Sequence, residues 1–81
     1  MKKLTREQIE FHILCDPPAD GEEVVYQIGQ YTDQGHSEVL DTYKSSNRAY
    51  DFIESKHLLG EFSVNDLIGG TIFISTVVVK G

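Results

Sequence analysis

The chain has 81 residues, of which 40% are hydrophobic and 10% aromatic, so it is long enough for one small apolar core and too short for two. Its 13 acidic side chains outnumber 7 basic ones, and its single cysteine excludes an internal disulfide framework. No segment approaches the roughly 18 apolar residues of a membrane-spanning helix, and no apolar signal segment follows the basic start at Met1-Lys2-Lys3. We therefore expect a single acidic domain over residues 1–81, in the cytoplasm, with no membrane partner.

The first apolar run, at residues 9–15, carries two competing signals. Its apolar residues alternate, which predicts a strand with one face formed by Ile9, Phe11, Ile13 and Cys15. Thr5 is followed three residues later by Gln8, however, and this pair has the form of a helix capping box. We predict a strand, and a short helix running to Leu14 is the alternative.

Residues 16–21 break the chain, because Pro17 and Pro18 lack a backbone N–H and Asp20-Gly21 favours a turn. Residues 23–31 and 37–43 then alternate in the manner of two strands. The loop at residues 32–36 between them includes Gly35, which can adopt a positive φ. The two strands should pair as an antiparallel hairpin.

A helix is predicted after residues 45–47, because Ser45, Ser46 and Asn47 all suit an N-cap. Gly60 suits the position just past its end, and its apolar positions have helical spacing in Ala49, Phe52, Ile53 and then His57 or Leu58. Residues 63–67 can add a short turn before the last run, at residues 71–79. The order strand, strand, strand, helix, strand predicts an α+β fold, a small antiparallel sheet with one helix packed on one face.

The run at residues 71–79 is the most β-prone of the chain and is apolar on both faces, with Phe73, Val77 and Val79 opposed to Ile72, Ile74 and Val78. One helix covers only one face of a sheet, so more apolar surface is present than the helix can bury. This favours either a protein-binding face or a homodimer in which Val77 and Val79 take part in self-association. The alternative is that long loops fold back over the uncovered face.

The acidic charge is concentrated in the first half of the chain. Between Glu7 and Tyr43 there are nine carboxylates and no lysine or arginine. Such a field repels nucleic acid and anionic membranes, and it attracts basic partners. The alternative is that the acids serve only to keep a small domain soluble.

The sequence shows no pattern typical of a catalytic or metal site. His12 and Cys15 lie on opposite faces of a strand, and a structural zinc needs four ligands. A catalytic thiol needs an electropositive setting, and Cys15 lies in the acidic half of the sequence. The carboxylates at residues 16–23 do not have calcium-loop spacing, and no phosphate-binding glycine motif occurs. We therefore expect no enzyme activity, no metal and no cofactor.

Exposed tyrosines combined with acids suit a protein interface, whereas single-strand nucleic-acid binders combine aromatics with basic residues. The predicted partner-binding residues are Asp20, Glu22, Glu23, Tyr31, Asp33, Glu38, Asp41 and Tyr43. They predict a non-catalytic protein-binding module, an inhibitor or adaptor whose acidic hairpin side docks on a basic, nucleic-acid-handling protein, without direct contact to nucleic acid.

In size, acidity and single-helix α+β make-up the chain resembles small phage-encoded inhibitors, including anti-CRISPR and other counter-defence proteins. The resemblance is one of general make-up and assigns no residue, and it implies a viral protein acting in the host cytoplasm. Two other hypotheses remain at this point. One is a self-associating structural domain that dimerises through the C-terminal strand, and the other is a small enzyme or ligand-binding protein.

Overall fold

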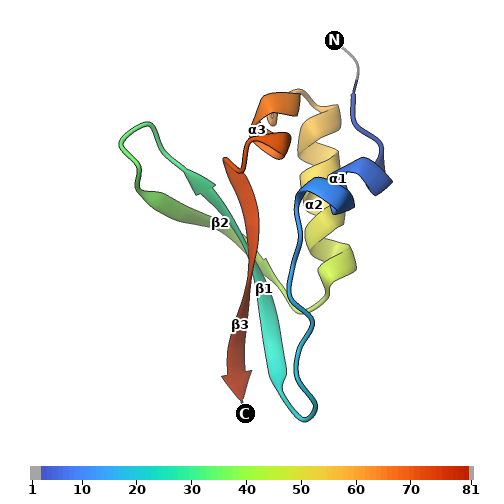
Figure 1. Ribbon diagram of the computed structural model, residues 1–81, viewed down its shortest axis with the longest axis vertical. Helices are drawn as coiled ribbons and strands as arrows, with labels where there is room; N and C mark the ends of the chain where they lie inside the picture. Colours follow the sequence, from blue (N-terminus) through green and yellow to red (C-terminus); the bar gives the residue numbers. More distant parts are fainter. Residues whose placement is uncertain (1–2, 81) are drawn as a thin grey trace.

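The computed structural model describes residues 3–80, and within them a three-stranded antiparallel sheet carries helices on one face (Figure 1). Met1, Lys2 and Gly81 lie outside the described residues. In chain order the elements are α1 (Arg6–His12), β1 (Glu23–Tyr31), β2 (Ser37–Tyr43), α2 (Ser46–Leu58), α3 (Val64–Ile68) and β3 (Ile72–Lys80). β1 is the central strand, with β2 and β3 on its two sides. The expected α+β class, an antiparallel sheet with a helix packed on one face, is confirmed.

The predicted strand at residues 9–15 is wrong, because the chain there forms helix α1. The capping box decides the local structure: the Gln8 N–H donates to Thr5 Oγ1 at 3.2 Å, and the Thr5 N–H donates to Gln8 Oε1 at 2.9 Å. Ile9 and Ile13, one helical turn apart, are buried, whereas Phe11 is 76% exposed. The alternation was therefore misleading, and the element order begins with a helix.

The predicted hairpin is confirmed, since β1 and β2 pair antiparallel across the loop at residues 32–36. Gly35 has a φ of +81°, which the loop requires and which glycine adopts without steric cost. The register shifts between Ile28, opposite Asp41, and Gly29, opposite Val39. Leu40 is therefore the extra residue of a β-bulge, and it packs against the core.

Helix α2 has its predicted start and end, with Ser45 at the N-cap and Gly60 at a φ of +85° just beyond the C-cap. His57 rather than Leu58 points into the core. The His57 side chain is fully used there, because Nε2 accepts from the Leu4 N–H at 2.9 Å and Nδ1 lies 2.8 Å from the Phe62 carbonyl oxygen. The ring thus links the N-terminal segment, α2 and the loop before α3.

The core lies between the helices and a single face of the sheet. Helix α2 contacts β1 and β2, α3 contacts β3, and α1 packs against α2 and α3. The predicted turn at residues 63–67 is α3, which begins with a second capping box between Ser63 and Asp66. The buried apolar residues are Ile9, Ile13, Val24, Tyr26, Ile28, Ala49, Tyr50, Ile53, Phe62, Leu67, Ile72 and Ile74.

The segment between α1 and β1 covers the end of this face that the helices do not reach. The Tyr50 hydroxyl donates to the Ile13 carbonyl oxygen at 2.6 Å, and the Thr76 hydroxyl donates to the Asp16 carbonyl oxygen at 2.9 Å. The loop thus folds over the helix-bearing face and leaves the opposite face of the sheet uncovered (Figure 1). Within residues 3–80 no helix is long and apolar enough to cross a bilayer.

Candidate functional site

The side of the sheet that faces away from the helices, here called the outer face, is uncovered and carries no charged side chain at its centre. Its residues alternate with the buried ones along β1 and β3, and the strand register places Val39 beside them. They are Val25, Gln27, Gly29, Tyr31, Val39, Phe73, Ser75, Val77 and Val79. In a chain with a net charge of −6, an uncharged sheet face without cover is a candidate docking surface.

An aromatic pair, Tyr31 and Phe73, lies toward the hairpin end of the outer face. The Phe73 ring lies over the backbone of Gly29, so closely that a Cβ at residue 29 would be 2.3 Å from Phe73 Cζ. Tyr31 packs against the same ring, with the centroids 4.8 Å apart and the planes at 35°. Beside the pair is a hollow of about 140 Å³, lined in part by Gln27, Val39 and Ser75. The missing side chain at Gly29 is what lets the aromatic pair lie flat on the sheet.

The predicted acidic residues lie toward both ends of β1 and do not form one patch, and the register places Glu38, which also lines the hollow, opposite Gln30 on the helix side of the sheet. Asp20, Glu22 and Glu23 precede or begin β1, and Asp33 and Glu38 lie at the hairpin end. The nine residues of β1 separate the two groups by roughly 26 Å. Glu22 also has a local role, because its Oε1 accepts from the Ala19 N–H at 3.0 Å.

Asp41 and Tyr43 are separated from Tyr31, although all three were predicted to take part in one surface. Asp41 accepts from the Thr42 N–H and from the Tyr43 hydroxyl, both at 2.8 Å. The Tyr43 ring packs on the helix side against Phe52, with the centroids 6.0 Å apart. Burial and the hydrogen bond to Asp41 raise the pKa of Tyr43. This pair therefore belongs to the junction of β2 and α2.

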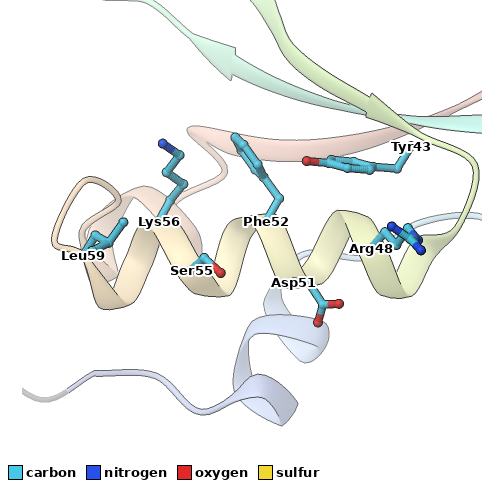
Figure 2. A pocket seen from close by; sticks show the side chains of 7 residues that line it. All are labelled: Tyr43, Arg48, Asp51, Phe52, Ser55, Lys56 and Leu59. Atoms are coloured by element: carbon cyan, nitrogen blue, oxygen red, sulfur yellow. The ribbon is translucent and has the colours of Figure 1, made fainter.

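Sequence reasoning missed an open groove between α2 and the end of β2 (Figure 2). Its volume is about 430 Å³, and its lining residues are Tyr43, Arg48, Asp51, Phe52, Ser55, Lys56 and Leu59. The groove thus combines polar and charged side chains of α2 with the aromatic rings of Tyr43 and Phe52. The available signal was Phe52, which lies one position from the buried Ile53 and widens the apolar stripe of the helix.

Most charged groups of this groove are already paired within the chain. Arg6 Nη1 lies 2.6 Å from Asp51 Oδ1 and ties α1 to α2. Lys56 Nζ lies 3.3 Å from Glu61 Oε2 and 5.6 Å from the centre of the Phe52 ring. No histidine or cysteine lines the groove, so its lining offers aromatic contact and the exposed Arg48 rather than a nucleophile with a base.

The residues considered for chemistry lie elsewhere and have structural contacts. His12 is exposed at the end of α1, with its ring 5.2 Å from that of Phe11. Cys15 is partly buried, and its sulfur lies 3.6 Å from the Tyr50 hydroxyl. Burial, followed by the contact with Cys15, raises the pKa of Tyr50. Within residues 3–80 no three histidine, cysteine or carboxylate side chains come together as metal ligands.

Comparison with known protein families, with curated proteins and with solved structures finds no significant match to this chain. The functional argument therefore rests on the chemistry of the two surfaces, the outer face and the groove. Of the two, the outer face has no charged side chain along its middle, and it has acidic groups at both ends.

Proposed function

We propose that the protein is a non-catalytic protein-binding module, an inhibitor or adaptor that docks through the outer face on a basic, nucleic-acid-handling protein. The observation that carries the proposal is the uncovered outer face, without a charged side chain along its middle, on a chain whose helices α2 and α3 and loop before β1 pack against the opposite face. Aromatic residues together with a lack of charged side chains distinguish the core of a protein interface from the rest of a surface.

The aromatic pair is suited to anchor the contact. Tyr31 is half exposed and is held against Phe73, so little conformational freedom remains for it to lose on binding. Tyrosines in such positions supply a large share of the binding energy in many interfaces. Val39 lies beside the pair, and Val25 and Val77 extend the apolar surface on the far side of Gln27 and Ser75.

The charge around the outer face selects the class of partner. Carboxylates at both ends of β1 surround the uncharged centre, so the favoured partner has an apolar patch with lysines and arginines at two sides. Proteins that bind nucleic acid present such basic groups to phosphates. Occupying these groups would block the partner's nucleic-acid site, which is how an acidic inhibitor of this size can act without chemistry.

The test compares two exposed apolar residues that are replaced by the same charge. Val39 on the outer face is 57% exposed, and Leu59 on the α2 side is 72% exposed. Tagged wild type, Val39→Lys and Leu59→Lys would be used to capture proteins from a lysate of the source cells, with quantification by mass spectrometry. The proposal expects one stoichiometric basic partner that Val39→Lys loses at least tenfold and Leu59→Lys retains.

The role of the acidic residues is tested by measuring the association rate with the purified partner. Glu23→Gln together with Glu38→Gln should slow association and reduce its dependence on salt, because long-range attraction acts mainly on the association rate. Equal loss of the partner in Val39→Lys and Leu59→Lys would contradict the choice of surface. An association rate that the glutamine substitutions leave unchanged at low salt would contradict the role of the acids.

A further inference from the structure

The two edges of the sheet are built differently. β2 and β3 are both edge strands, because β1 lies between them. Along β2 the bulge at Leu40 interrupts the edge, and Asp41 Oδ1 accepts from the Thr42 N–H at 2.8 Å. A bulge and a carboxylate over an edge N–H are two of the devices by which proteins prevent another strand from pairing. β2 is thus a protected edge.

In the described part of the chain, β3 has no carboxylate over its outward N–H groups, and its own register shift, between the Glu23–Lys80 and Val24–Val78 pairs, lies at the end of the strand beyond Val78. The Tyr31 N–H donates to the Thr71 carbonyl oxygen at 2.9 Å, and this bond determines which residues of β3 direct their backbone groups toward β1. Because an antiparallel ladder uses every second residue, Phe73, Ser75 and Val77 bond to β1. The residues between them point their N–H and C=O groups away from β1, and these are Ile72, Ile74, Thr76 and Val78. Within residues 3–80 no other element supplies hydrogen bonds to these outward backbone groups.

We propose that the outward edge of β3 pairs antiparallel with the β3 strand of a second copy of the chain, about a two-fold axis at Ser75. This register is the one that uses all four outward residues, with Ile72 opposite Val78 of the second copy and Ile74 opposite its Thr76. It places Ser75 opposite itself in a pair without direct hydrogen bonds. The result is one continuous six-stranded sheet.

A second copy fits this edge for two reasons. The segment from Ile72 to Val79 carries no charge, so self-pairing brings no like charges face to face even though the chain has a net charge of −6. Helix α2 contacts β1 and β2, whereas β3 is contacted mainly by the short α3. The free end of β3 accordingly has exposed side chains at Val78 and Val79, which leaves room for a neighbouring strand.

This pairing goes beyond the proposed docking function, because it would join the docking surfaces of two copies. The outer faces of the two copies would become one surface, with Phe73 beside Val77 of the second copy across the new strand pair. An aromatic residue opposite a β-branched one is a favourable cross-strand pair. The two aromatic anchors would then lie on the same side of the sheet, available to a two-fold or elongated partner.

The decisive test is a cysteine cross-link at the axis. In a Cys15→Ala background, Ser75→Cys would place two thiols on Cα atoms about 4.5 Å apart, within the range of a disulfide. The matched control is Val77→Cys on the same face, where the two cysteines would be about 13 Å apart. Under mild oxidation we expect most of Ser75→Cys, and little of Val77→Cys, to migrate as a covalent dimer.

Mass measurement by light scattering provides an independent readout. Wild type should have twice the 9.1 kDa mass of the chain. Val78→Pro removes an outward N–H that β1 does not use, so it should give a folded monomer. Thr42→Pro makes the same change on the protected edge and should leave the mass of the wild type unchanged.

A wild-type mass of one chain at every concentration, or equal cross-linking of Ser75→Cys and Val77→Cys, would overturn the proposal. A wild-type monomer that still binds its partner protein would mean that the outward edge of β3 pairs with a strand of that protein and not with a second copy of the chain. The proposed function is judged separately, because Val39→Lys alters the outer face of β2 and should not change the mass.

Discussion

The two faces of β1 differ in what covers them more than in how apolar they are. Toward the helices the strand places Val24, Tyr26 and Ile28, all buried, and on the outer face it places Val25 and Tyr31 among others, which stay accessible. Helices α2 and α3 and the loop before β1 pack on the first face, and α1 packs on these two helices. The face toward the helices thus determines whether the chain folds, while the outer face remains open to a partner.

Charge follows the same division. The ion pairs of Arg6 with Asp51 and Glu54 hold α1 on α2, so they support the helix layer. The carboxylates near the outer face lie at its two ends and leave its centre neutral. Substitutions should therefore separate into those that change the free energy of unfolding and those that change binding.

Ile28→Ala should cause the largest loss of stability. The Ile28 side chain is fully buried in the helix-side core, and its truncation removes apolar contacts and leaves a cavity, at a cost of about 3 kcal/mol. The control is Val39→Ala on the outer face, expected to cost less than about 1 kcal/mol. Urea denaturation measures both, and similar losses for the two variants would contradict the assignment of the faces.

His57→Leu should destabilise the protein by about 2–3 kcal/mol, because the Leu4 N–H and the Phe62 carbonyl oxygen both lose a buried partner. His36 lies exposed in the hairpin loop, so His36→Leu should stay within about 0.5 kcal/mol of wild type. Thermal denaturation of the two variants checks the difference. A His57→Leu variant as stable as wild type would show that the ring does not hold the N-terminal segment.

Gly29→Ala should cost about 1–2 kcal/mol, because the new Cβ would meet the Phe73 ring at 2.3 Å and push it off the sheet. The ring can move into solvent on the uncovered face, which limits the cost. Adding Phe73→Ala should remove most of the penalty of Gly29→Ala, as measured by a double-mutant cycle on unfolding free energies. Additive losses would mean that the ring does not rest on Gly29.

Tyr50→Phe should have the smallest effect at neutral pH, a loss of about 1 kcal/mol for the hydrogen bond to the Ile13 carbonyl oxygen. At alkaline pH the effect of Tyr50→Phe on stability changes sign. Because the pKa of Tyr50 is raised in the folded state, the unfolded chain loses this proton first. Stability is therefore retained below about pH 10 and falls as the pH rises above it, by up to about 1.4 kcal/mol per pH unit. Denaturation at several alkaline pH values should show a shallower fall in Tyr50→Phe, and identical slopes would contradict the account.

The sequence was sufficient to predict the elements whose signals are local and agree with one another. The hairpin follows from alternation on either side of a loop with Gly35, and α2 follows from its N-cap serine, its helical spacing and Gly60. At residues 9–15 two local signals disagreed, and the capping box of Thr5 and Gln8 outweighed the alternation because it satisfies backbone donors directly.

The candidate site was less predictable, because it depends on which face the helices choose. Alternation shows that Val25 and Val24 lie on opposite faces of β1, but not which of them becomes buried. Acids that are close in sequence, such as Glu23 and Asp33, lie at opposite ends of a strand. Asp41 and Tyr43 changed sides relative to Tyr31 because of the bulge at Leu40, which no residue pattern announces.

The most direct test of the outer face as the binding surface is site-specific photo-crosslinking in the cells that make the protein. A photoreactive aromatic residue would replace Val39 in one variant and Leu59 in another, because both side chains are apolar and well exposed. The account predicts one defined adduct with a basic protein from position 39 and none from position 59. An adduct from position 59 alone, or equal adducts from both positions, would contradict it.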